Sequence, residues 1–138
     1  MRRLACTLLL LVAAGCGSDK STAPKRIEGT YTMQSLGGET LPMIYYEDPT
    51  AGQQLELLGG SITINPDGTF SAPWSFRVTE SGQVSPYGET CTGPFTRTGN
   101  NITITETDNG GFCGVTADGV WDGNNTITFT DEQIVYTR

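Results

Sequence analysis

The most constraining feature of this sequence is a pair of apolar runs between Gly60 and Val78, joined by Pro66-Asp67-Gly68. That connection supplies a fixed φ, a side-chain acceptor and a residue that tolerates positive φ, which together suit a tight turn. Apolar and polar residues alternate along the second run. An alternation with a period of two places one face of a strand in a core and the other in water. We therefore predict a β-hairpin, in which the apolar residues of the second strand are Phe70, Ala72, Trp74, Phe76 and Val78.

Short runs of the same kind recur on both sides of this hairpin, separated by turns rich in Gly, Asn and Asp. Pro42 cannot donate to a ladder, so we expect the run around it to pair at an edge. Gly59-Gly60 suggests a bulge within one long strand. The strands expected from these patterns span residues 27–36, 41–46, 53–65, 69–78, 87–97, 102–105, 112–121, 127–129 and 134–136.

The connections after Gly60 are short, so neighbouring strands should pair antiparallel in chain order. Pairing residues 27–36 with 134–138 would remove the two open edges of such a sheet. We predict an all-β fold, an antiparallel up-and-down meander of eight to ten strands closed into a barrel over residues 26–138. A two-sheet immunoglobulin-like sandwich is the alternative, but that fold calls for a Cys before its buried Trp, whereas Trp74 precedes both later cysteines.

The start of the chain has the pattern of an export signal. Two arginines are followed by an apolar run over residues 4–14, which is too short to span a membrane but suits a signal peptide. The run ends in Leu11-Val-Ala-Ala-Gly-Cys16, which resembles the lipobox of bacterial lipoproteins. The resemblance implies that residues 1–15 are removed, that Cys16 is acylated, and that residues 16–25 form a flexible tether to the membrane. The alternative is an ordinary signal peptide cut after Ala14.

The position after the lipobox cysteine bears on localisation. Gly17 stands there instead of Asp, and in bacterial lipoproteins an Asp at this position tends to retain the protein at the inner membrane. The resemblance therefore implies a lipid-anchored protein of the bacterial cell envelope, at the outer membrane if the cell has one.

The folded part also resembles the bacterial lipocalin-like domain family, and the likeness extends over residues 26–138. The matching stretches are Gly29-Thr-Tyr31, the hairpin from Ser61 to Phe70, residues 99–104 with the sequence Gly-Asn-Asn-Ile-Thr-Ile, and the Val-Tyr-Thr-Arg ending at Arg138. The resemblance implies a small barrel that can hold an apolar ligand.

Charge and composition exclude several classes of function. From Arg26 onward, four arginines face 14 acidic residues, which gives a net charge of −10. A domain so acidic should not bind nucleic acid, because that binding rests on basic side chains that neutralise phosphates. The chain contains no His, the commonest general base near neutral pH and the commonest ligand of transition metals. We therefore expect that the protein is not an enzyme and has no metal site and no cofactor.

Two cysteines, Cys91 and Cys113, remain after processing, and export exposes them to an oxidising compartment. We predict a disulfide between them. A third strand separates their expected strands, which would place the cysteines roughly 9–10 Å apart, beyond the ~7 Å Cα limit of a disulfide. The intervening strand can stop by Thr105, however, and let Cys113 reach across. A redox-active or metal-binding thiol pair is the alternative, and the lack of a C-x-x-C spacing argues against it.

Aromatic and apolar residues in the expected inward phase could line a ligand pocket or simply fill the barrel. The first possibility makes the chain a ligand-binding lipoprotein, and the second a non-catalytic interaction or structural module. We interpret the acidic pairs Glu47-Asp48 and Asp131-Glu132 as solvated turn charges, and Asp122-x-Asn124-x-Thr126 as turn chemistry instead of a calcium loop. The candidate ligand-binding residues are Tyr31, Met33, Trp74, Phe76, Phe95 and Trp121.

Overall fold

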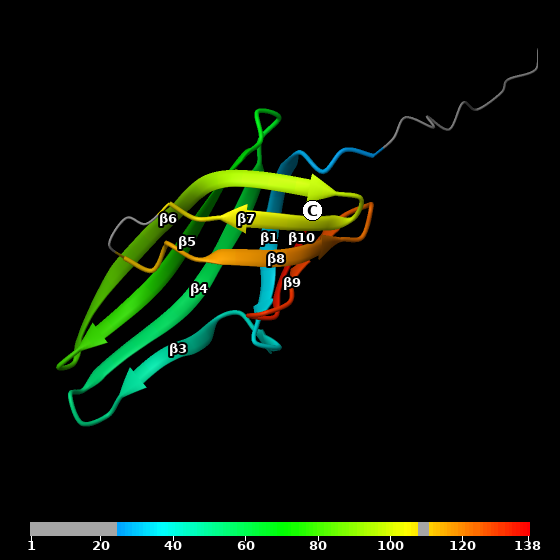
Figure 1. Cartoon of the computed structure of the whole chain (residues 1–138). Coiled ribbons are helices and arrows are strands. Elements are labelled where there is room, and N and C mark those ends of the chain that lie inside the picture. The colour runs from blue at the N-terminus through cyan, green and yellow to red at the C-terminus, as the bar shows by residue number, and fades with distance from the viewer. Residues whose placement is uncertain (1–24, 108–110) are drawn as a thin grey trace, which may run out of the picture.

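The computed structural model describes residues 25–107 and 111–138, and within these ranges the chain is all β (Figure 1). The predicted signal peptide and Cys16 lie outside the described residues. Across the part described, no helix has the length and apolarity needed to cross a bilayer. The strands are β1 (Gly29–Leu36), β2 (Glu39–Thr40), β3 (Met43–Asp48), β4 (Gln53–Ile64), β5 (Thr69–Glu80), β6 (Gln83–Thr98), β7 (Asn101–Thr105), β8 (Thr116–Trp121), β9 (Thr126–Phe129) and β10 (Ile134–Thr137).

Eight of these strands close into an antiparallel barrel, which is consistent with a lipocalin-like fold. From β4 to β10 every strand pairs with its neighbour in the chain. The predicted pairing of the first and last strands is confirmed, since Met33 lies opposite Tyr136. The ring closes where β1 pairs with β4, with Gly29 opposite Ile64. Because of this direct pairing, β2 and β3 lie outside the ring, at the two ends of the sheet order.

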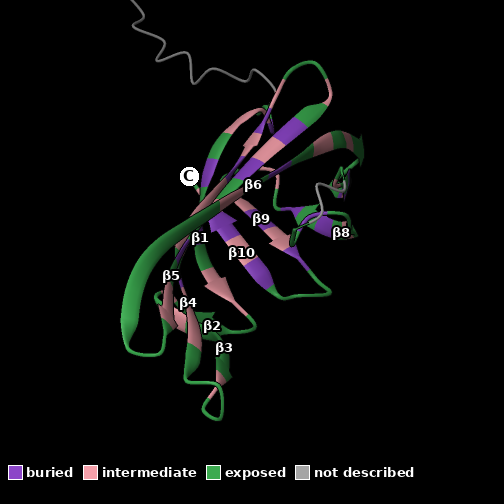
Figure 2. Cartoon of the chain, turned by 90° about the vertical axis from the view of Figure 1, so that its left-hand side faces the viewer, coloured by how far each residue is buried: buried purple, intermediate pink, exposed green. Residues whose placement is uncertain are grey.

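The core lies inside the barrel and follows the alternation of the strands. Phe70, Ala72 and Phe76 of β5 are buried, whereas Thr69 and Arg77 are exposed. Figure 2 shows buried residues along β9 and β10 and mostly exposed residues along β3. The side chains with less than 2% exposure are all apolar or aromatic, so the barrel is held mainly by burial of apolar surface. They are Trp121, Tyr31, Phe70, Phe76, Phe129, Leu57, Ile62, Ile64, Ile102 and Ile127.

The predicted hairpin is present between β4 and β5. The Asp67 carboxylate accepts hydrogen bonds from the Thr69 amide at 3.0 Å and from the Thr69 hydroxyl at 2.6 Å. These hydrogen bonds hold the pKa of Asp67 below its usual value. Gly68 has a φ of 83°, which a residue with a side chain rarely adopts.

Four strands extend beyond the barrel as a twisted sheet, which we call the wing. It consists of β3 with residues 53–58 of β4, 75–80 of β5 and 83–90 of β6. The wing leaves the ring because β7 pairs only with Phe95–Thr98 of β6. The register shifts between Leu57 and Gly59, which confirms the predicted bulge. In Figure 1 the wing points to the lower left, away from the start of the described chain.

One expected strand is shorter than predicted. The alternation suggested a strand over 112–121, but β8 begins at Thr116. The prediction was wrong for residues 112–115, which cross the end of the barrel. Side-chain carboxylates, described below, accept hydrogen bonds from the amides of this segment in place of a ladder partner.

Candidate functional site

An aromatic cluster lies where the wing meets the barrel, and we call this opening the mouth. Phe76 of β5 lies at its centre, with ring centroids 5.7 to 6.1 Å from four other rings. Phe76 itself is buried, but three of its neighbours are 39% to 50% exposed. The aromatic residues of the mouth are Tyr45, Trp74, Phe76, Tyr87 and Phe112.

The register of β5 and β6 places this cluster. Phe76 lies opposite Tyr87, and Trp74 lies opposite Glu89. Residues opposite one another on antiparallel strands share a face and have neighbouring side chains. The inward face of the two strands therefore carries aromatic rings and, beside them, a carboxylate.

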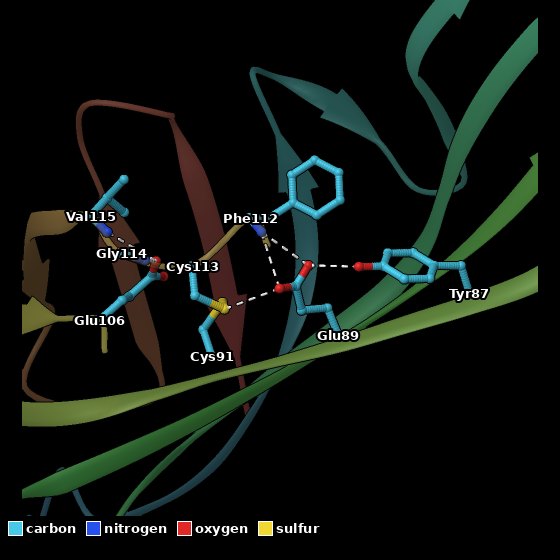
Figure 3. Close-up of a disulfide and its surroundings, with 8 residues drawn as sticks. All are labelled: Tyr87, Glu89, Cys91, Glu106, Phe112, Cys113, Gly114 and Val115. Atoms are coloured by element: carbon cyan, nitrogen blue, oxygen red, sulfur yellow. Dashed lines mark hydrogen bonds between the residues drawn. A yellow bond between two sulfur atoms is a disulfide. The ribbon is translucent and has the colours of Figure 1, made fainter. Parts of the chain in front are cut away.

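That carboxylate holds the segment 111–115 over the mouth. Glu89 accepts hydrogen bonds from the Phe112 amide at 3.0 Å and from the Tyr87 hydroxyl at 3.0 Å (Figure 3). A Cβ at Gly111 would lie 2.0 Å from Glu89 Oε1, so a larger residue there would force the Glu89 carboxylate to move. On the other side, Glu106 accepts hydrogen bonds from the backbone amides of Gly114 at 3.1 Å and Val115 at 3.4 Å. Two glutamates thus fix the path of the segment.

The disulfide lies between these two carboxylates (Figure 3). Cys91 and Cys113 are bonded, with their Cα atoms 5.4 Å apart, so the prediction is confirmed. The expected obstacle is absent because β7 ends at Thr105, and the Thr107 amide then donates to the Thr92 carbonyl at 2.8 Å. The two sulfurs and a Glu106 oxygen lie within 4.8 Å of one another. In the disulfide neither sulfur is a thiolate, the form that binds metals.

A third glutamate reaches the mouth from the loop between β9 and β10. Glu132 lines the cavity together with Glu89 and Glu106. Burial raises the pKa of Glu132 above its usual value, and the charges of Glu106 and Asp131 add to that rise. Glu132 is exposed and lies in a turn, as predicted, and it also lines the mouth cavity.

The carboxylates of the mouth also raise the pKa values of nearby tyrosines. The hydrogen bond that Tyr87 donates to Glu89 raises the pKa of its phenol. Burial raises the pKa of Tyr45, and the charge of Glu132 raises it further. Burial likewise raises the pKa of Tyr136, with contributions from Glu106 and Glu132. Each of these shifts includes a contribution from a mouth carboxylate.

The cavities at this end are small. The one in the mouth has a volume of about 50 Å³ and is walled by Tyr45, Trp74, Phe76 and Phe112 with the three glutamates. A second one of about 30 Å³ continues toward the barrel interior. One water needs roughly 10–15 Å³, so each holds a few waters or a small chemical group. The barrel core is otherwise filled by its own side chains.

The opposite end of the barrel, which we call the closed end, carries arginines over aromatic rings. The Arg138 guanidinium lies 4.7 Å from the centroid of Tyr31, and that of Arg97 lies 4.5 Å from the centroid of Trp121. Arg138 also donates to the carbonyls of Glu28 at 2.8 Å and Arg26 at 2.6 Å. These contacts join the last strand to the start of the described chain.

The structure divides the predicted ligand-binding residues between the two ends. Trp74 and Phe76 line the mouth cavity. Tyr31 and Trp121 are buried beneath the arginines of the closed end. Met33 is buried in the core, and the half-buried Phe95 packs against the core cluster. As a set, these six residues do not enclose one pocket, and whether any of them binds a ligand stays a prediction.

Several mouth residues were not singled out from the sequence, namely Tyr45, Tyr87, Glu89, Glu106 and Phe112. A signal for two of them existed. Glu89 is in phase with the inward residue Cys91, and Glu106 is in phase with Ile104. A carboxylate at an inward position of a strand is costly unless it is hydrogen-bonded, so it marks a special environment.

Comparison of the chain with models of protein families, with curated proteins and with solved structures found no match.

Proposed function

We propose that the chain is a lipid-anchored lipoprotein of the bacterial envelope whose lipocalin-like barrel binds a small apolar ligand at its mouth. The observation that supports this most is the exposed aromatic cluster. Tyr45, Tyr87 and Phe112 are 39%, 40% and 50% exposed although the barrel has a filled core without them. Contiguous exposed apolar surface of this kind commonly marks a binding site.

The size of the cavities defines how such a ligand binds. With about 50 Å³ in the mouth and about 30 Å³ beneath it, the barrel admits one end of a small molecule. The remainder of the ligand lies against the exposed rings of the wing. Trp74 and Phe76 form the floor of this site, and Phe112 forms one wall.

The anchor is proposed from the lipobox resemblance, and the fold shows which end of the barrel the tether would join. The described chain begins at the closed end, where Lys25 contacts Asn124 and the Arg26 carbonyl contacts Arg138. The wing lies at the other end (Figure 1). A lipid on Cys16 would therefore be joined to the barrel at its closed end, opposite the mouth.

Ligand binding can be tested with N-phenyl-1-naphthylamine, a neutral apolar dye that fluoresces when shielded from water. We expect the dye to bind protein in dodecyl maltoside in excess of its uptake by protein-free micelles, and Phe112→Ala to reduce that excess. Val120→Ala is the matched control, because Val120 is 43% exposed on β8 outside the mouth. Equal dye binding by all three proteins would reject the mouth as the site.

The anchor is tested with Cys16→Ser, by fractionating the cells that express it and by measuring the mass of the protein. Two or more acyl chains anchor stably where one does not, at about 0.8 kcal/mol per buried CH₂. An acidic domain has no comparable attraction to the bilayer. We expect Cys16→Ser to lack the lipid, and Cys6→Ser, within the predicted signal peptide, to behave as the wild type. A Cys16→Ser protein with an acylated mass would contradict the proposal.

A second candidate, a protein-interaction module, is favoured by a groove on the wing. The groove has a volume of about 230 Å³ and includes Leu58, Val84 and Pro86 in its walls. Leu58 and Val84 are 41% and 63% exposed. Native mass spectrometry of the protein from its own host distinguishes the two, since a partner lost on Leu58→Asp but kept on Phe112→Ala would support the module.

A further inference from the structure

We infer that the ligand of the mouth is an organic cation, a small molecule with an ammonium head group. This inference rests on the proposed function and specifies the chemistry of the ligand. It follows from three observations, namely the aromatic walls of the cavity, the carboxylates among them, and the positions of the basic residues of the domain.

The walls of the cavity have the composition of an aromatic cage. Trp74 and Phe76 stack with an interplanar angle of 29°, and Phe112 lies 5.7 Å from Phe76 at 26°. Tyr45 meets Phe112 edge-on at 90°, so the rings that line the cavity differ in orientation. Aromatic faces attract cations, and cages of this kind recognise quaternary ammonium groups.

Three carboxylates line the same cavity, and none forms an ion pair among residues 25–107 and 111–138. Glu89 and Glu106 accept hydrogen bonds from backbone amides and a phenol, which are neutral donors. Within those residues, the one salt bridge joins Arg77 to Glu56 on the wing. Among the described residues, no basic side chain therefore pairs with the carboxylates of the mouth.

The remaining basic groups of the described chain are at the closed end or point toward it. Arg138 and Arg97 cover Tyr31 and Trp121, and Lys25 contacts Asn124. The Arg26 carbonyl is bound by Arg138. No basic side chain of the described residues lines the mouth cavity, so a ligand has to supply the positive charge.

Charge and size favour a cation over other small ligands. A fatty acid or another anion would place a carboxylate beside Glu89, Glu106 and Glu132, which like-charge repulsion disfavours. A neutral apolar molecule would gain burial against the rings but nothing from the carboxylates. A volume of about 50 Å³ suits a head group better than a whole ligand. These limits select a compact cation with a short apolar body.

Choline and 3,3-dimethylbutan-1-ol provide a matched pair of probes, because they have nearly the same shape and differ in charge. We titrate each into the ¹⁵N-labelled full mature protein in dodecyl maltoside and follow the Phe112 amide and the Trp74 indole. We expect both signals to shift with choline and the dissociation constant to be about tenfold lower than for the alcohol.

A charge-matched pair of variants locates the effect. Glu132→Gln removes one carboxylate from the cavity, and Glu39→Gln makes the same change in β2, outside it. We expect Glu132→Gln to weaken choline binding about threefold and Glu39→Gln to leave it unchanged. The ¹⁵N spectrum of each variant shows whether the fold is retained.

The outcomes separate the inference from the proposed function. Equal affinities for choline and the alcohol at the Phe112 and Trp74 signals would overturn the cation inference and leave apolar binding at the mouth intact. No shift of these signals with either probe, together with no dye binding, would overturn both. Tighter binding of hexanoate than of choline would also reject the inference.

Discussion

Aromatic side chains lie at both ends of this barrel, but their surroundings differ. At the closed end, Tyr31 and Trp121 are 0% and 1% exposed, and each lies under an arginine of the chain. At the mouth, Phe112 is 50% exposed, and carboxylates take the place of arginines. The chain thus supplies cations to its own aromatic rings at the closed end and supplies none at the mouth. The first arrangement serves stability, and we propose that the second serves binding.

The largest expected difference between the two ends concerns truncation of an aromatic side chain. Trp121→Ala should lower the free energy of unfolding by about 3–5 kcal/mol, because it empties a buried volume in the core. Phe112→Ala should cost less than about 1 kcal/mol, because half of that side chain is already in water. Urea unfolding followed by circular dichroism measures both. Similar losses for the two variants would contradict the division of roles.

The next effect concerns the bond that ties the mouth to the barrel. Replacing both cysteines, in Cys91→Ser with Cys113→Ser, removes a crosslink between residues 22 apart. In the chain-entropy model this costs about 3 kcal/mol of stability. Reduction of the wild type should give the same loss, measured by unfolding with and without a phosphine reductant. Reduction without any loss of stability would mean that the carboxylates alone hold segment 111–115.

A smaller loss is expected from the closed end when its cation is removed. Arg138→Gln deletes the contact with Tyr31 and hydrogen bonds to the carbonyls of Glu28 and Arg26. We expect a loss of about 1–2 kcal/mol. Arg77→Gln is the control, because its salt bridge to Glu56 is on the surface and contributes about 0–1 kcal/mol. Equal losses in the two variants would show that the contact with Tyr31 adds nothing.

The smallest stability effect concerns the pH dependence at the mouth. The pKa of Glu132 is raised in the folded state, so folding takes up a proton and stability falls as pH rises through that pKa. Glu132→Gln should therefore stabilise the protein at pH 7, by at most about 0.5 kcal/mol because the carboxyl group is partly exposed. The gain should vanish below about pH 4, where both states are protonated. Urea unfolding at the two pH values checks the sign, and a destabilised variant at pH 7 would contradict it.

Much of the barrel could be predicted because a strand with one buried face must alternate. The alternation in 69–78 fixed the inward face of β5, and short turns fixed its neighbours. The direct pairing of β1 with β4 could not be predicted from the sequence, because it joins residues 29 to 35 positions apart and leaves β2 and β3 outside the ring. Segment 112–115 was assigned to a strand because its pattern alternates, yet two carboxylates replace the ladder there.

The mouth was predicted only in part for a related reason. Trp74 and Phe76 follow the alternation of one strand, so the sequence marked them. Tyr45, Tyr87 and Phe112 come from three separate segments that meet through β3 pairing, the β5–β6 register and the disulfide. Periodicity describes one strand at a time and does not report which segments meet in space.

If the ligand supplies a cation that the mouth lacks, then a cation placed there by the chain itself should compete with the ligand. Val115 lines both cavities and is 46% exposed, so Val115→Lys places an ammonium group beside the carboxylates. The account predicts that this variant binds choline at least about tenfold more weakly than the wild type. Val115→Met, which changes the volume without charge, should stay within about twofold. Equal choline affinities for the Lys and Met variants, both folded, would contradict the claim.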